Sequence, residues 1–300
     1  MPVELEPISD KTILVRLTDE SATNAFDPEF MSELDLKLRQ IIDDEKIHSF
    51  ILTGTEKFFC AGANINEFRK HYDKGTIGKW IKQMTDILHP LILKIRNSNT
   101  IMIAAVNGAA AGAGLGLALS ADYRIASPGG KFAASYFSLG LSPDGGTSWL
   151  LPRLVGSQKS RIFFFENQVW SAEKCLEYGA VDELVEDSLL IEKSIKKAND
   201  WGSWSKASRS SKDLLDHQEN NDLEIQAESN NMNDARILAN ESAYQDGDMH
   251  MNELNLQIQK LQSELDHYKS NLRELSAKSQ VWGNPFTVYN KEIILTNGTT

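Results

Sequence analysis

Short apolar runs alternate with segments of helical period in the first half of the chain, and this alternation constrains the fold most. The runs have the length of β-strands and lie at Thr12–Leu17, Ser49–Thr53, Ile101–Val106 and Tyr123–Ala126. Between them, apolar residues recur at helical spacing over Pro28–Asp44 and Gly78–Ile95. Strands that alternate with helices predict an α/β core. The chain has 300 residues, 41% of them hydrophobic, which is ample for one large domain with a sizeable core, or for a domain and an appendage.

The composition changes near Trp201. Residues 202–250 are rich in Ser, Asn, Asp and Glu and have few apolar positions, so we expect helices and loops there. We therefore predict a core over residues 1–200, a helical region over 201–250, and a coiled-coil-like helix with a tail over 251–300. A short strand is expected at Glu292–Thr296.

The segment 251–278 has the a/d pattern of a coiled coil. Its apolar residues are spaced 4, 3, 4, 3, 4, 3: Leu254, Ile258, Leu261, Leu265, Tyr268, Leu272 and Leu275. Two interpretations remain open: self-association or binding of a partner helix, and packing of an amphipathic helix on its own domain. The narrow stripe favours the first, because a helix of a globular domain usually has a wider apolar face.

Charge and cysteine content exclude several classes of protein. The net charge is −11 with no strongly basic stretch, which argues against a nucleic-acid partner. Cys60 and Cys175 cannot form a disulfide framework, and no Cys/His cluster has metal-ligand spacing, so we expect two buried thiols and no metal site. The N-terminus lacks the pattern of a signal peptide, no stretch of about 18 residues is continuously apolar, and the C-terminal NGTT is not a peroxisomal address. We expect a cytoplasmic protein without a membrane span.

Two turns of small residues each follow a predicted strand. Phe58–Ile65 follows Phe50–Gly54, and its small residues would let a ligand approach the main-chain N–H groups. Ala104–Gly116 runs from a strand through a Gly/Ala turn into a predicted helix at Leu115–Ala121, and a helix N-terminus presents free N–H groups. The alternatives are an ordinary turn in the first case and close helix packing in the second.

A third segment, Phe137–Gly156, carries one carboxylate in a turn. Asp144 follows Pro143 and precedes two glycines, just ahead of an apolar helical run. It is a candidate base, but Asp is also a favoured N-cap residue and Pro-Asp-Gly is typical of turns.

Taken together, these segments resemble the crotonase superfamily, also called the enoyl-CoA hydratase/isomerase family. The resemblance covers roughly residues 10–200 and rests on five motifs in order: Asn24-Ala25-Phe26, CAGANI, NGAAAGAGLGLALSAD, SPDGGTSWLLPRLVG, and AEKCLEYGAVDELV at Ala172–Val185. It implies a ββα spiral core with a C-terminal helical region. It also implies a coenzyme A thioester that serves as substrate rather than cofactor, and assembly into a trimer or hexamer.

The resemblance also implies roles for individual residues. The main-chain N–H groups of Ala63 and Ala113 would form the oxyanion hole, although the family commonly has glycine at the second position. The adenine end of the substrate would lie near Ala25. The rest of the substrate would lie along the two turns and beside the Tyr136 ring, and the residues that would line it are Ala61, Gly62, Asn64, Ile65, Gly112 and Tyr136.

The same comparison argues against hydration. Family hydratases handle water with two glutamates, whose positions here are Gly116 and Tyr136. Asp144 instead resembles the base of the branch that contains Δ3,Δ2-enoyl-CoA isomerases and ring-modifying isomerases. It would take a proton from C2 of a 3-enoyl thioester and return it at C4. Apolar surroundings, with Phe132, Tyr136 and Trp149 as candidates, should raise the pKa of Asp144.

Three alternatives remain open. In the dehalogenases of 4-chlorobenzoyl-CoA, the same aspartate is a nucleophile, and a histidine stands near the position of His89. The thioester could also belong to an acyl-carrier protein. Some crotonase-fold proteins are non-catalytic interaction domains, and the heptad segment suits such a role.

Residues 235–255 keep only a weak similarity to the C-terminal motif of the family. The sequence does not show which basic residues would bind the phosphates of coenzyme A, and Arg69, Lys70 and Lys94 cannot be assigned to them.

Overall fold

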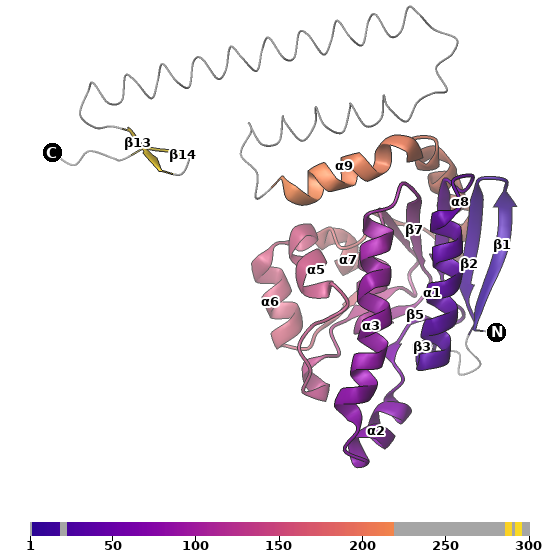
Figure 1. Ribbon diagram of the computed structural model, residues 1–300, viewed down its shortest axis with the longest axis vertical. Coiled ribbons are helices and arrows are strands. Elements are labelled where there is room, and N and C mark those ends of the chain that lie inside the picture. The colour runs from indigo at the N-terminus through magenta and orange to yellow at the C-terminus, as the bar shows by residue number, and fades with distance from the viewer. Residues whose placement is uncertain (1, 19–22, 219–285, 290–291, 296–300) are drawn as a thin grey trace, which may run out of the picture. The chain divides into compact units, whose positions relative to one another are not determined.

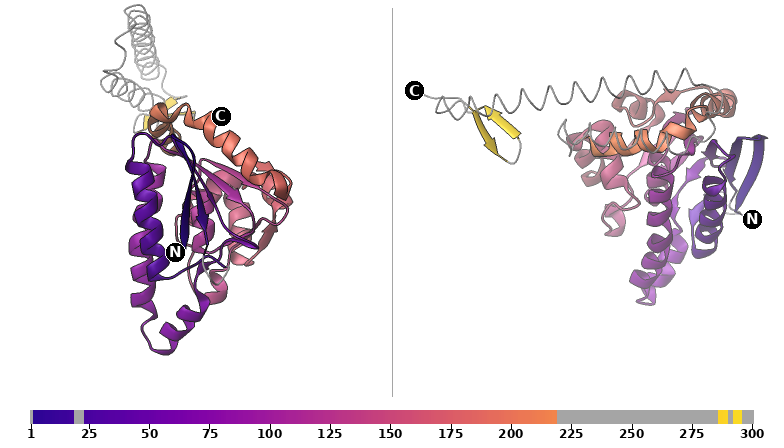
Figure 2. Two further views of the ribbon diagram at one scale, coloured as in Figure 1. Left: turned by 90° about the vertical axis from the view of Figure 1, so that its right-hand side faces the viewer. Right: turned by 45° about the horizontal axis from the view of Figure 1, so that its top comes forward.

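The computed structural model describes residues 2–18, 23–218, 286–289 and 292–295 (Figures 1 and 2). The chain divides into two compact units, Met1–Lys212 and Asp213–Thr300. The heptad segment 251–278 lies outside the described residues, so its two interpretations stay predictions.

The strands of the first unit are β1 Val3–Ser9, β2 Thr12–Leu17, β3 Ala25–Phe26, β4 Ser49–Thr53, β5 Phe58–Cys60, β6 Gly62–Ala63, β7 Ile101–Val106, β8 Ala109–Ala111, β9 Tyr123–Ala126, β10 Lys131–Ala133, β11 Val169–Ser171 and β12 Glu183–Leu184. Its helices are α1 Pro28–Asp43, α2 Ile65–Asp73, α3 Ile77–Arg96, α4 Ala113–Leu119, η1 Phe137–Leu139, α5 Thr147–Val155, α6 Ser157–Phe165, α7 Ala172–Tyr178, η2 Asp187–Leu189 and α8 Leu190–Gly202. Helix α9, Ser205–His217, crosses the boundary, and β13 Phe286–Tyr289 with β14 Glu292–Leu295 belongs to the second unit.

A six-stranded sheet forms the centre of the first unit. Its strand order is β1-β2-β4-β7-β9-β12, antiparallel between β1 and β2 and parallel thereafter. Alternate residues of one strand belong to different hydrophobic clusters: Met102 and Ala104 join one, and Ile103 joins the other. Helices α1 and α3 run side by side over one face (Figure 1), and α8 supplies Leu190 and Ala198 to the other. Burial on both faces explains why these strands read as unbroken apolar runs.

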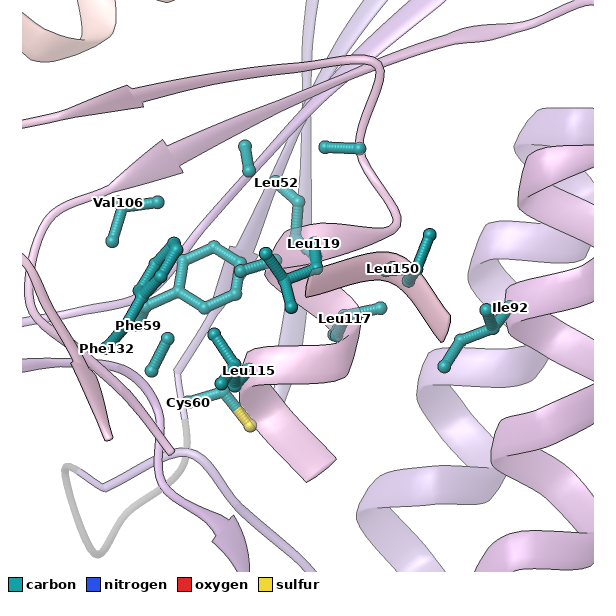
Figure 3. Close-up of a cluster of buried hydrophobic side chains, with 14 of the residues drawn as sticks. Leu52, Phe59, Cys60, Ile92, Val106, Leu115, Leu117, Leu119, Phe132 and Leu150 are labelled. Carbon is teal, nitrogen blue, oxygen red and sulfur yellow. The ribbon is translucent and has the colours of Figure 1, made fainter. Parts of the chain in front are cut away.

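A second sheet carries the turns of small residues. Its order is β11-β10-β8-β5, and β5 and β10 both run parallel to β8. Helix α4 follows β8 directly, and all its residues after Ala113 are buried. Its leucines, Leu115, Leu117 and Leu119, lie among other buried apolar side chains (Figure 3). The core therefore fixes α4 tightly, and with it the turn that precedes the helix.

The predicted α/β class is confirmed, and the four predicted strands appear as β2, β4, β7 and β9 with the expected bounds. The helices α1 and α3 match the predicted segments to within one residue at each end. Strand β14 matches the short strand expected near the C-terminus, and it pairs with β13 in an antiparallel hairpin. Cys60 and Cys175 are buried, and neither is part of a disulfide, as expected. Among the described residues, no helix has the length and hydropathy needed to cross a bilayer.

The first compact unit reaches Lys212, in helix α9. The hydroxyl of Ser208 in α9 donates to the carbonyl of Asn99. The ammonium of Lys212 donates to the Thr100 carbonyl over 3.1 Å and forms a 2.9 Å ion pair with Asp122. Polar side chains of α9 therefore connect it to the residues just before β7 and to Asp122.

Candidate active site

Strand β5 leads into the first turn, and a buried amide holds it in place. Asn24 has a left-handed φ of 49° and is fully buried, and its side chain donates to the carbonyls of Phe58 and Phe59 over 3.1 and 3.2 Å. The chain then passes through Gly62, whose φ is 78°. A Cβ at this position would lie 2.5 Å from the Ala111 oxygen, so only glycine allows this approach of the two turns.

The second turn joins β8 to α4. Gly112 has φ 51° and ψ −125°, a conformation that favours glycine, and Ala113 is the first residue of the helix. The N–H groups of the first helical turn have no partner within the helix. The Ala113 N–H is therefore available to a ligand on helix geometry alone.

The two predicted oxyanion donors lie close together. Asn64 N donates to Phe26 O over 3.0 Å, and because successive main-chain groups of a strand alternate in direction, the Ala63 N–H faces away from β3. A Cβ built on Gly62 would stand 3.1 Å from the Ala113 nitrogen. The turns thus bring Ala63 and Ala113 to one place, as the resemblance implied.

A pocket opens between these turns and α3. Its lining is mostly aliphatic and aromatic, with Ala63 and Ala113 on one side and Asp144 as the only charged residue among the described residues that form it: Phe26, Ala61, Ala63, Ile65, Phe68, Trp80, Ile81, Met84, Thr85, Leu88, Gly112, Ala113, Ser135, Tyr136, Leu139, Leu141 and Asp144. The arrangement places one carboxylate near two main-chain donors in apolar surroundings.

The carboxylate of Asp144 does not cap a helix. Helix α5 begins at Thr147 with Gly146 as N-cap, and no side chain caps it. Three hydrogen bonds instead hold the Asp144 carbonyl: from Thr147 Oγ1 over 2.8 Å, from the Thr147 N–H over 3.0 Å, and from the Tyr136 hydroxyl over 3.2 Å. The buried Oδ1 of Asp144 has no hydrogen-bond partner among the described residues. The main chain at Asp144 is therefore fixed, and one oxygen of its buried carboxylate has an unused capacity to accept a hydrogen bond.

Burial raises the pKa of Asp144, as the sequence predicted. His89 and the Tyr136 hydroxyl act in the opposite direction and offset part of this effect. Of the three aromatic residues proposed as its surroundings, only Tyr136 lines the pocket. Phe132 belongs to the hydrophobic core, and Trp149 is 39% exposed with Arg153 stacked on its ring. The aliphatic side chains of Leu88, Leu139 and Leu141 supply the apolar surroundings instead.

The loop that carries Asp144 packs directly on Gly116. A Cβ at Gly116 would lie 2.1 Å from the Gly145 oxygen and 2.9 Å from its carbonyl carbon. The space that a glutamate side chain would need at this position is therefore filled by the main chain of the loop. Gly114 is packed as closely, since its Cβ would meet the Cys60 oxygen at 2.3 Å. Close packing, one of the two alternatives that the sequence left open, applies to this segment, and Gly112 and Ala113 at its start also line the pocket.

The other predicted substrate-binding residues divide into two groups. Ala61, Ile65, Gly112 and Tyr136 line the pocket. Ala25 and Gly62 are buried as paired residues of β3 and β6, and the Asn64 side chain caps α2 by accepting from the N–H groups of Asn66 and Glu67. Among the candidate cations, Lys70 pairs with Glu67 and Lys94 with Asp43.

Sequence reasoning missed most of the pocket wall on α2 and α3, although the apolar period of Gly78–Ile95 contained its signal. The wall includes Phe68, Trp80, Met84 and Leu88. His89 is exposed and outside the lining, and its Nε2 accepts from the Gly145 N–H over 3.3 Å. It therefore contacts the main chain of the loop that carries Asp144 rather than the pocket.

Comparison with known proteins identifies the family. The family model described as enoyl-CoA hydratase/isomerase matches residues 8–255. The chain belongs to this family. A probable enoyl-CoA hydratase of Mycobacterium tuberculosis is 34% identical over 58% of this chain and 66% of its own length. The 1,2-epoxyphenylacetyl-CoA isomerase of Escherichia coli and the short-chain-enoyl-CoA hydratase of Clostridium acetobutylicum are each 32% identical, over 63% of this chain and 71% of their own lengths. The chain thus spans about two thirds of the curated relatives it matches.

Solved structures of the family have the same fold. The crystal structure of an enoyl-CoA hydratase from Bacillus anthracis superposes with a TM-score of 0.73 at 25% identity, covering 80% of this chain and 92% of that one. An enoyl-CoA hydratase from Polaromonas superposes with a TM-score of 0.71 at 28% identity, covering 79% and 91%. The crotonase-type architecture expected from the sequence is confirmed, and the similar proteins include both hydratases and an isomerase.

Proposed function

We propose that this protein is an acyl-CoA thioester isomerase that converts 3-enoyl-CoA to 2-enoyl-CoA with Asp144 as its single base. The observation that carries the proposal is the packing of the Asp144 loop on Gly116. Family hydratases need a carboxylate at this position, and here Gly145 fills the space. The second hydratase position holds Tyr136, which is buried and whose hydroxyl donates to the Asp144 carbonyl.

The reaction follows from one carboxylate and two N–H donors. The Asp144 carboxylate removes a proton from C2 and becomes a carboxylic acid. The electrons of the broken C–H bond delocalise over C2, C3 and C4 and onto the thioester oxygen, which accepts from the Ala63 and Ala113 N–H groups. The same carboxylic acid then protonates C4, and a double bond remains between C2 and C3. Each main-chain donor at a developing oxyanion contributes roughly 3–4 kcal/mol to the transition state.

The surroundings of Asp144 suit this proton shuttle. Burial raises the pKa of its carboxyl group, so the group holds the transferred proton better than an exposed aspartate would. The raised pKa of Tyr136, caused first by burial and then by the Asp144 charge, keeps the phenol protonated. A neutral phenol donates to the loop carbonyl and does not compete as a base.

Substrate conversion tests the proposal. Purified protein should convert 3-enoyl-CoA to 2-enoyl-CoA, exchange the C2 protons in deuterium oxide, and add water to 2-enoyl-CoA at least a hundredfold more slowly. Asp144→Asn should abolish exchange and conversion while acyl-CoA binding remains. Isomerisation that survives in the Asn variant, or an acyl-enzyme burst with a haloaryl-CoA, would contradict the mechanism. Failure to bind any CoA thioester would favour a non-catalytic interaction protein, and turnover restricted to a carrier-protein thioester would change the substrate but not the chemistry.

A further inference from the structure

One wall of the pocket lies along α3. Leu88, Met84 and Trp80 follow one another at four-residue intervals, so they lie on one face of the helix and all line the pocket. The Leu88 side chain lies next to the Asp144 loop, since a Cβ at Gly145 would be 3.4 Å from Leu88 Cδ2. Trp80 therefore stands two helical turns from the reacting atoms.

Aromatic contacts with α2 hold the Trp80 indole in place. The His71 ring stacks on it with centroids 5.6 Å apart and planes 19° apart, and the Phe68 ring meets it edge-on at 6.3 Å. Trp80 is 3% exposed, although α2 itself has no buried residue. The indole ring is therefore held by two aromatic contacts and can limit the length of the pocket.

The distance from Leu88 to Trp80 limits the acyl chain. At a rise of 1.5 Å per residue, their eight-residue separation spans about 12 Å along α3. Van der Waals contact with the indole takes about 3.5–4 Å of this length, which leaves roughly 8 Å. An extended acyl chain advances about 1.3 Å per carbon because its bonds of about 1.5 Å are inclined to the chain axis. The space therefore holds about six carbons.

We propose that Trp80 closes the acyl pocket and restricts the substrate to short, uncharged, apolar acyl groups. This inference rests on the proposed function, since it names the substrate class of the same site. Charged acyl groups are disfavoured because Asp144 is the only charged residue among the described residues of the lining, and a second carboxylate would be buried near it without a cation.

Binding of saturated acyl-CoA thioesters tests the inference without requiring turnover. Calorimetry with butanoyl- to dodecanoyl-CoA should show affinity rising about fourfold per methylene, the effect of about 0.8 kcal/mol per buried CH₂, and levelling off near six carbons. In Trp80→Leu the rise should continue for two or three more carbons. Trp80→Phe keeps a smaller aromatic ring and should extend the rise in affinity by about one carbon. This variant provides the test if Trp80→Leu does not fold. Succinyl-CoA should bind at least tenfold more weakly than butanoyl-CoA.

Two further variants make the result specific. Tyr72→Ala changes an α2 side chain that is 67% exposed and outside the pocket, and it should leave the chain-length profile unchanged. Leu141→Ala enlarges the pocket at a lining residue outside α3. If this variant accepts longer acyl chains while Trp80→Leu and Trp80→Phe do not, the inference is overturned. So would wild-type affinity that keeps rising beyond ten carbons. A profile that shifts as expected in a protein that isomerises no enoyl-CoA would support the role of Trp80 and refute the proposed reaction.

Discussion

Gly116→Ala is the substitution that most directly tests how the base is positioned. The added Cβ would lie 2.1 Å from the Gly145 oxygen, while ordinary van der Waals contact begins near 3.4 Å. The carbonyl must therefore retreat by about 1.3 Å, the difference between these two distances, and Asp144 is the preceding residue. A displacement of about 1 Å at a reacting group costs on the order of a hundredfold in rate. We expect kcat/KM for isomerisation to fall by about this factor.

The same substitution should destabilise the protein by about 1–3 kcal/mol, as overpacking of a well-packed core does. Gly78→Ala is the matched control, because Gly78 also lies in a helix but its Cβ would meet nothing within 4 Å. Alanine is favoured over glycine in a helix by about 0.8–1 kcal/mol, so this variant should melt slightly higher with unchanged activity. Enzyme assays and thermal denaturation followed by circular dichroism report both effects. If Gly116→Ala keeps kcat/KM within twofold of the parent and its melting temperature does not fall, the Asp144 loop is not held against α4 as described.

Four other predictions concern charge and turn geometry. Asp144→Asn should have a higher melting temperature than the parent at neutral pH, because a raised pKa in the folded state means that the ionised carboxylate opposes folding. In melting curves measured across pH, this difference in melting temperature should shrink as pH falls through the raised pKa of the folded state and vanish below the ordinary value of 3.8. The kcat/KM of the parent should decline as pH falls through the raised pKa of Asp144, because the base becomes protonated at a higher pH than an exposed aspartate would. A kcat/KM profile that is flat down to pH 4 would contradict this. Gly62→Ala should lower kcat/KM at least tenfold, because its Cβ would stand 2.5 Å from the Ala111 oxygen and force apart the turns that carry the two N–H donors. Lys212→Ala should lower the free energy of unfolding by roughly 3 kcal/mol in urea titrations, because it removes the ammonium group that pairs with the buried Asp122 carboxylate.

The sequence predicted the elements whose physical signal is local. Strands such as Ile101–Val106 are buried on both faces and therefore read as continuous apolar runs, and α1 shows helical spacing throughout. The short strands β6 and β8 have no such pattern, because they consist only of Gly and Ala, which have low strand propensity. A parallel pairing between Phe58 and Ala109 cannot be inferred from either segment alone.

The candidate site was predictable where it depends on motifs. Ala63, Ala113, Tyr136 and Asp144 were named from the order of the motifs, and all four line the pocket. The other side chains around Asp144 were not predictable in the same way. Trp149 follows Asp144 closely in sequence but is 39% exposed, whereas Leu88 comes from a distant helix and packs against the Asp144 loop. Contacts between elements decide which residues surround a carboxylate, and sequence proximity does not.

The parallel pairing of β5 and β8 has a consequence for how such a site can change. The two turns follow neighbouring strands, whose spacing in a sheet is about 4.8 Å in any protein, so the backbone itself brings the turns close together. The group that Ala113 contributes is a main-chain N–H, so alanine can stand at this position, where the family commonly has glycine. In the proposed mechanism, the two N–H donors thus depend on the backbone, whereas the base lies on a separate loop. A change of reaction would then require a new residue on this loop and room for it against α4, while the thioester keeps its place.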